Sequence, residues 1–181
     1  MFLNIITPCS RPENLYKISD SINIEEGSYR WIVVMDSHEK PNENLIPPNC
    51  EIYLHKNPDS IFGNSQRNYA LDLIQNGHVY FNDDDTTVHK DLWDNIKDLK
   101  EGFISFSQNN QDGSLRLKGE EIKLYSVDSH NFLVDINVVE STRFNITHYD
   151  ADGYFAVECY NKPSSKIFIP KVLSVYNSLI C

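Results

Sequence analysis

The sequence predicts an α/β fold with a mainly parallel central sheet, helices on both of its sides and a smaller α+β extension in the second half. Three observations indicate this fold. Short apolar runs of strand length recur in the first hundred residues, segments with helical periodicity separate most of them, and strand-like pieces follow one another after Gly102. Because 181 residues suffice for one core, we expect residues 1–181 to form a single domain.

Four strands are expected in the first half, each a short apolar run bounded by turn residues. They are residues 2–7 (FLNIIT, ended by Pro8), 31–36 (WIVVMD), 51–55 (EIYLH) and 78–81 (HVYF). Three helices are expected between or after them, each beginning at a residue that can cap its N-terminus. The capping residues are Ser10 (followed by Pro12), Asn64 or Ser65, and Thr86 or Thr87.

The second half is expected to be richer in strands. The strand-like pieces are residues 103–107, 115–119, 121–127, 131–139, 166–170 and 171–176. A stretch compatible with a helix lies at about residues 151–160. No internal repeat or clean linker divides the chain, so this half is expected to pack on the first.

Composition and charge exclude several classes of protein. A net charge of −10 and a pI near 4.9 argue against binding nucleic acid, which needs a basic face. No apolar run approaches the roughly 20 residues of a membrane span, and the first residues lack the features of a signal peptide. The cysteines are expected to be free thiols, although one disulfide is compatible with the sequence. They are Cys9, Cys50, Cys159 and Cys181. The protein is expected to be cytoplasmic and could be peripheral at a membrane.

The most informative feature is the run Asp83, Asp84 and Asp85, which directly follows the expected strand at 78–81. Two unit charges about 4 Å apart repel by roughly 4 kcal/mol at an effective dielectric constant of about 20. The run is therefore either a solvated loop or a site for a divalent cation. Residues 7–11 and Asp36 follow neighbouring strands, and ligands collect at the carboxyl ends of such strands. Hard oxygen ligands favour Mg²⁺ or Mn²⁺.

Six segments, in this order, resemble the nucleotide-sugar glycosyltransferases of the GT-A fold, especially family 2-like members. They are IITPCSRPENL, WIVVMD, GNSQRNYALDLI, VYFNDDD, DSHNFLV and YDADGYFAVE. The resemblance implies a nucleotide-binding half at about residues 1–100 and an acceptor-side half at about 101–181. It also implies transfer of a hexose from a nucleotide-diphosphate donor, with UDP as the default nucleotide, to a glycan or lipid-linked saccharide.

The resemblance also implies roles for single residues. The residues expected to bind the nucleotide sugar are Thr7, Pro8, Ser10, Arg11, Asp36, Arg67, Asp83 and Asp84. Asp85, together with Asp83, is expected to hold Mn²⁺ or Mg²⁺. In YDADGYFAVE the acids Asp150, Asp152 and Glu158 are candidate bases, and the late acidic motif of the family favours Asp152. With Asp152 as base, the reaction inverts the configuration at the sugar carbon.

Further residues have a structural and a functional interpretation. His130 is expected to be a structural histidine, the alternative being a contact with substrate. His148 is an alternative extra metal ligand. Tyr149, Tyr154 and Phe155 either pack in the core or stack on a sugar ring.

Two other functions stay open. DDDTTV also matches the motif of the haloacid-dehalogenase-like phosphatases, with Asp83 as nucleophile and Asp85 as acid. A nucleotide-sugar or glycan-binding module without turnover is the second alternative. The chain is short for a GT-A enzyme and lacks the Q-x-x-R-W motif of processive synthases, which favours transfer of single sugars.

Overall fold

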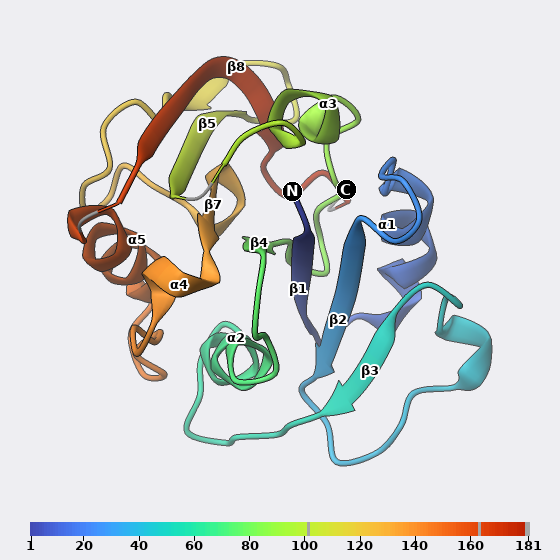
Figure 1. The fold of residues 1–181 in the computed structure, drawn as a ribbon. Coiled ribbons are helices and arrows are strands. Elements are labelled where there is room, and N and C mark those ends of the chain that lie inside the picture. Colours follow the sequence, from blue (N-terminus) through green and yellow to red (C-terminus); the bar gives the residue numbers. More distant parts are fainter. Residues whose placement is uncertain (101, 163, 180–181) are drawn as a thin grey trace.

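The computed structural model describes residues 1–100, 102–162 and 164–179, and its centre is one sheet (Figure 1). The strands are β1 (Leu3–Cys9), β2 (Tyr29–Met35), β3 (Glu51–Leu54), β4 (His78–Phe81), β5 (Phe103–Asn109), β6 (Leu115–Leu117), β7 (Phe132–Asp135) and β8 (Lys166–Val175). The α-helices are α1 (Leu15–Ser21), α2 (Asn64–Leu71), α3 (Leu92–Ile96), α4 (Ile136–Val139) and α5 (Ala151–Asn161). The 3₁₀ turns are η1 (Pro12–Asn14), η2 (Glu43–Leu45) and η3 (Ser129–Asn131).

The sheet has the order β3-β2-β1-β4-β7-β5-β6, and β8 pairs with β5. Strands β1 to β4 pair in parallel with one another, whereas β7 runs antiparallel to both β4 and β5. The expected α/β architecture with a mainly parallel sheet is therefore confirmed. The strands of the second half extend the same sheet through the β4–β7 pair.

Helices cover both faces of the sheet, as expected. One face packs against α2 and α5 through a core that contains Ile6, Phe81 and Phe155. The other face packs against α1 and α3 through a core that contains Ile5 and Tyr80. Neighbouring strand residues serve opposite cores because side chains alternate along a strand.

The expectation that Pro8 ends the first strand is wrong, since β1 continues to Cys9 and pairs Pro8 with Val34 of β2. The carbonyl of Ile6 faces the β4 side, where it accepts the N–H of Asn82 at 2.9 Å. Because backbone groups alternate along a strand, the nitrogen of Pro8 faces that side too. The β1–β4 pairing ends at Ile6 and Phe81, so the proline deprives no strand of a hydrogen bond.

The three expected helix caps are also wrong. Ser10 makes no cap, because its N–H and hydroxyl both donate to Asp84. Gly63, rather than Asn64 or Ser65, is the N-cap of α2, with φ +75°. A Cβ at Gly63 would lie 2.6 Å from Cβ of Pro8, so only glycine lets the start of α2 approach the end of β1 this closely.

The third helix begins at Leu92 rather than after Thr86 or Thr87, because distant side chains hold the preceding backbone. The N–H of Thr87 donates to Ser178 and that of Val88 to Ser21. Four expected strands differ in the second half. Residues 121–127 form turns, residues 131–139 divide into β7 and α4, and 166–170 and 171–176 join in β8.

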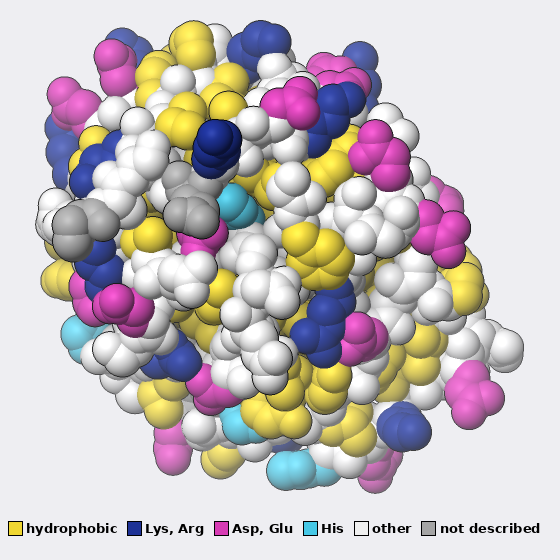
Figure 2. Space-filling view, viewed as in Figure 1, with side chains coloured by type: hydrophobic (Ala, Val, Ile, Leu, Met, Phe, Trp, Pro, Cys, Tyr) yellow, Lys and Arg dark blue, Asp and Glu magenta, His cyan; other side chains and the backbone are white. Residues whose placement is uncertain are grey.

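The structure shows how charges and thiols are distributed over the described residues. On the face shown in Figure 2, acidic and basic side chains are interspersed and form no large basic area. Cys9, Cys50 and Cys159 are free thiols, whereas Cys181 lies outside the described residues. Within the described ranges, every helix is too short or too polar to cross a bilayer.

Aromatic packing decides the role of Phe155, which the sequence left open. The ring is 1% exposed and stacks on Phe144 with centroids 4.3 Å apart. Phe81 meets the same two rings edge to face at 5.0 and 5.5 Å. Phe155 is therefore a core residue, whereas its neighbour Tyr154 is 51% exposed.

Phe155→Ala should lower the free energy of unfolding by about 3–5 kcal/mol, because it leaves a cavity in this aromatic cluster. Tyr154→Ala, the matched control on the same helix, should change it by no more than about 0.5 kcal/mol. Urea unfolding followed by circular dichroism measures both. Similar losses from the two variants would contradict the packing described here.

Candidate active site

A cavity of about 640 Å³ opens at the carboxyl ends of β1, β2 and β4. Its walls come from the loop after β1, the start of α2, the acidic run after β4 and residues of the second half as far as Tyr176 and Asn177. This is the edge at which ligands bind in open α/β sheets.

Nine of the ten residues that the sequence singled out line this cavity. They are Pro8, Ser10, Arg11, Asp36, Arg67, Asp83, Asp84, Asp85 and Asp152. Thr7 does not line it, because its side chain is fully buried and its hydroxyl accepts a hydrogen bond from Trp31 Nε1 at 2.9 Å. Along β1 the alternation of side chains turns Thr7 into the core while the residues after it reach the cavity.

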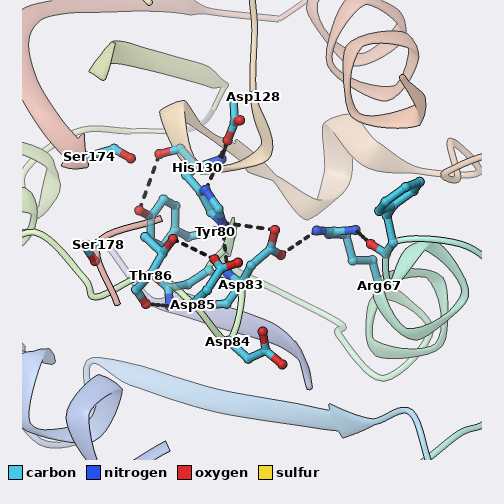
Figure 3. A network of polar contacts seen from close by, with 12 residues as sticks. Arg67, Tyr80, Asp83, Asp84, Asp85, Thr86, Asp128, His130, Ser174 and Ser178 are labelled. Carbon is cyan, nitrogen blue, oxygen red and sulfur yellow. Dashed lines mark hydrogen bonds and ion pairs between the residues drawn. The ribbon is translucent and has the colours of Figure 1, made fainter. Parts of the chain in front are cut away.

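Asp84 holds the loop after β1. Its Oδ2 accepts the backbone N–H groups of Ser10 and Arg11 at 2.6 and 2.8 Å, and Arg11 Nε donates to Oδ1 at 2.8 Å. Only 3% of the residue is exposed, and in Figure 3 its carboxylate points away from Asp83. Asp84 therefore positions the loop that carries Ser10 and Arg11.

Asp85 shares the same arginine. Arg11 Nη2 donates to Asp85 Oδ2 at 2.8 Å, and the hydroxyl of Thr86 donates to Oδ1 at 3.1 Å. One guanidinium thus faces two of the three acids, while 40% of its own side chain stays exposed.

Asp83 lies between two cationic side chains from other elements (Figure 3). Arg67 of α2 forms an ion pair with Oδ1, and Nε2 of His130 lies 3.3 Å from Oδ2. Burial alone would raise the pKa of Asp83, but the charges of Arg67 and His130 outweigh it and lower the pKa to about 2. Asp83 is therefore ionised at neutral pH.

His130 is 2% exposed and lies between Asp83 and Asp128, whose Oδ1 is 3.1 Å from Nδ1. Burial by itself lowers the pKa of His130, but the two carboxylates raise it to about 10. One contact points the other way, since the backbone N–H of Asp83 is directed at Nε2 from 2.9 Å and needs a lone pair there. We assign the imidazolium, because two carboxylates within 3.3 Å of the ring nitrogens raise its pKa by more than burial lowers it.

The chain of charges continues beyond His130 to residues that the sequence did not indicate. Arg116 of β6 pairs with Asp128 at 2.8 Å, and its guanidinium lies 3.8 Å from the ring centroid of Tyr176. The pKa of Asp128 is far below its usual range, because the charges of His130 and Arg116 outweigh burial. The sequence around Arg116 contains no motif that indicates a role for it. Asp128 and His130 belong to the segment DSHNFLV, which was part of the resemblance.

The protein's own cations therefore neutralise the acidic run. The residues adjacent to the run in the sequence gave no reason to expect this. Within the described ranges, no three acidic, histidine or cysteine side chains are grouped as a metal site. The Asp83 and Asp85 side chains keep 26% and 12% of their surface exposed and line the cavity. They fit a cation held by one or two carboxylates and completed by substrate phosphates and water.

The three candidate bases differ in position. Asp150 and Asp152 line the cavity, whereas Glu158 lies further along α5 and accepts the hydroxyl of Thr142 at 2.6 Å. Burial and the nearby charge of Asp128 raise the pKa of Asp152 to about 6. His148 is not among the lining residues, and its ring lies 3.8 Å from Asp150.

Solved structures share this arrangement of strands and helices. Residues 1–349 of S. aureus TarS superpose with a TM-score of 0.72 at 14% identity, over 97% of this chain and 60% of TarS. The same fragment in complex with UDP-GlcNAc gives a TM-score of 0.74 at 15% identity, over 97% and 58%. The mannosyltransferase PcManGT from Pyrobaculum calidifontis, in complex with GDP-Man and Mn²⁺, gives 0.69 at 13% identity, over 97% and 56%.

The chain has the fold of these glycosyltransferases. It spans only 56–60% of the length of those three structures. No family model matches the sequence, and no curated protein sequence is similar to it. The fold expected from the resemblance, GT-A with a mostly parallel sheet, is confirmed.

His130 should remain protonated up to about pH 9. Its pKa is raised from the 6.5 of an unfolded chain to about 10, so its stabilising contribution is complete below pH 6.5 and disappears as the pH rises toward 10. Nitrogen-15 NMR of the ring measures the midpoint, and urea unfolding between pH 7 and 10 measures the stability.

His130→Gln should remove that slope, which makes it the control. A ring midpoint at or below 6.5 would mean that the neutral ring accepts the N–H of Asp83 instead.

Proposed function

We propose that this chain is the catalytic domain of a metal-dependent glycosyltransferase. It transfers a hexose from a nucleotide-diphosphate donor to a hydroxyl of a glycan or lipid-linked saccharide. A UDP-sugar is the first candidate for the donor. The transfer inverts the sugar carbon, and Asp152 is the base. The observation that carries the proposal is that one cavity takes in both the acidic run after β4 and a carboxyl group whose pKa is about 6.

The proposed donor site is the wall formed by β1, β2 and α2. Asp36 lies at the end of β2, where it accepts a hydrogen bond from Gln66 Nε2 at 3.1 Å, and its carboxylate suits an N–H of the base. Gln66 Oε1 and Arg67 Nε are buried without a hydrogen-bond partner in the described part of the chain. Buried polar atoms cost free energy unless paired, so these two favour a polar ligand on this wall.

Residues of this chain account for the proton transfer in the proposed reaction. The acceptor hydroxyl gives its proton to Asp152, its oxygen forms a bond to the anomeric carbon, and the bond from that carbon to the phosphate oxygen breaks. The nucleoside diphosphate leaves with the bonding electrons. A carboxyl group with a pKa near 6 is ionised at pH 7 and is a stronger base than an ordinary aspartate.

Negative charge that develops on the leaving diphosphate needs a positive partner. Arg11 lines the cavity and 40% of its side chain is exposed, but its guanidinium is already paired with Asp84 and Asp85. A bound Mn²⁺ or Mg²⁺ on Asp85 and Asp83 would act as a Lewis acid on the same charge. The Mn²⁺ complex of PcManGT supports this assignment by similarity of fold.

The phosphatase alternative fits the geometry less well. The motif of such a phosphatase belongs on the first strand, whereas here β1, β2 and β3 precede the acidic run. Such a phosphatase also needs a lysine beside the acids, and among the described residues no lysine lines the cavity. p-Nitrophenyl phosphate hydrolysis without nucleotide binding would restore this alternative.

Asp152→Asn should lower sugar transfer by about 10²–10⁴-fold and leave UDP affinity within twofold, because it removes a proton acceptor but no donor contact. UDP release from a panel of UDP-sugars and calorimetric titration with UDP measure the two effects. Asp150→Asn, also in the cavity, is the matched control and should retain most of kcat, because a contact of Asp150 with the acceptor would act on KM.

The wild-type transfer rate should rise with pH through about 6, as Asp152 ionises. Binding of UDP without turnover of any donor would favour the binding module, and equal losses in the Asp150 and Asp152 variants would contradict the assigned base.

Asp85→Asn should abolish the gain in UDP affinity that Mn²⁺ provides, because the cation loses its carboxylate. The measured quantity is the ratio of UDP dissociation constants with and without Mn²⁺, so a general effect of releasing Arg11 cancels. Asp20→Asn, on the exposed side of α1, is the control. An unchanged ratio would show that Asp85 holds no metal.

A further inference from the structure

Three large aromatic side chains stand exposed around the cavity. Phe62, Tyr125 and Tyr149 are 63%, 79% and 73% exposed, and all three line it. They come from three separate loops, before α2, between β6 and η3, and before α5. We call Phe62, Tyr125 and Tyr149 the aromatic rim. Exposed apolar area of this size is unfavourable in water and is typical of a binding surface.

Backbone conformation points to the same residues. Phe62 and Tyr125 have φ of +52° and +65°, in the left-handed region that bulky residues rarely adopt. Such a conformation costs about 1–3 kcal/mol and persists where the surrounding structure imposes it. Neither ring is buried in return, so packing of the free protein does not account for the strain.

Hydrogen bonds fix the Phe62 side of the rim. The carbonyl of Phe62 accepts Arg67 Nη1 at 2.6 Å, and its ring meets Tyr149 edge to face at 4.8 Å. The two segments are tied together, because the N–H of Ile61 donates to Ile146 and Asn64 Nδ2 donates to the carbonyl of His148. These two rings are therefore presented on a rigid base.

The Tyr125 side of the rim lies against the first turn of α5. A Cβ placed on Gly153 would be 3.1 Å from Leu124 Cδ1 and 3.8 Å from the nitrogen of Tyr125. Gly153 follows Asp152 directly, and Tyr149 precedes Asp150. Tyr125 and Tyr149 thus belong to segments at the N-terminal end of α5, where Asp150 and Asp152 lie, whereas the proposed donor wall comes from β1, β2 and α2.

We propose that the aromatic rim is the acceptor subsite and that it takes an uncharged saccharide ring. This rests on the proposed glycosyl transfer. A pyranose has an apolar C–H face that packs on aromatic rings and a hydroxyl edge that donates to carboxylates such as Asp150 and Asp152.

Charge selects against an anionic acceptor. Asp150 and Asp152 follow Tyr149 in sequence and line the same cavity, and the protein carries a net charge of −10. The three arginines that line the cavity, Arg11, Arg67 and Arg116, are each already paired with an aspartate. A phosphorylated or uronic acceptor would find no unpaired arginine among the described lining residues, so a neutral one is favoured.

The test uses a glycan array of neutral and uronic oligosaccharides, followed by saturation-transfer NMR with the neutral binders and UDP present. Tyr125→Ala and Tyr149→Ala should each weaken binding of the neutral glycan, and raise its KM as acceptor, by about tenfold. UDP affinity should stay within twofold. Tyr16→Ala, an exposed aromatic that does not line the cavity, is the control and should change neither value.

Three results would overturn the assignment of the rim. Loss of UDP affinity in the rim variants would place the rings in the donor site. Unchanged glycan binding would show that the rim side chains do not contact the acceptor. Preference for uronic glycans would contradict the charge selection. Glycan binding is scored without turnover, so absence of any sugar transfer would count against the proposed function while the rim is still tested.

Discussion

The structure depends on compensation of the three carboxylates that follow β4. Arg11 faces Asp84 and Asp85, while Arg67 and His130 face Asp83. Without these cations the repulsion among three adjacent acids at a strand end would oppose the folded state. Each cation comes from a different part of the chain, so compensating the charge also assembles the cavity: the loop after β1, helix α2 and turn η3 all converge on one carboxylate run.

This compensation joins the two halves of the chain. Asp83 pairs with Arg67 from the first half, and through His130 and Asp128 it connects to Arg116 of β6. Figure 3 shows His130 standing between the two carboxylates. The antiparallel pairing of β4 with β7 brings η3 to this position, because η3 immediately precedes β7. The extension of the sheet thus contributes to the wall of the proposed donor site as well as to the proposed acceptor side.

Two aspartates of one cavity have opposite electrostatic environments. Asp83 faces two cations and has a pKa of about 2, whereas burial without a paired cation raises that of Asp152 to about 6. Separation of pKa values between neighbouring acids is how a site assigns permanent charge to one group and proton transfer to another. In the proposed reaction Asp83 remains an anion throughout and Asp152 accepts the proton.

The sequence by itself determined the parallel half of the sheet and most of the residues at its carboxyl edge. Apolar runs of strand length bury both faces of a sheet, and polar residues directly after them can only lie at its edge. Tertiary structure alone decided what compensates the acids, because Arg11, Arg67 and His130 are distant from them in sequence. It also decided that Thr7 and Phe155 serve the core, that helices begin away from their expected caps, and that Phe62 and Tyr125 stand exposed at the cavity. Side-chain direction, long-range hydrogen bonds and backbone strain depend on which distant segments pack together. The local sequence pattern does not specify that packing.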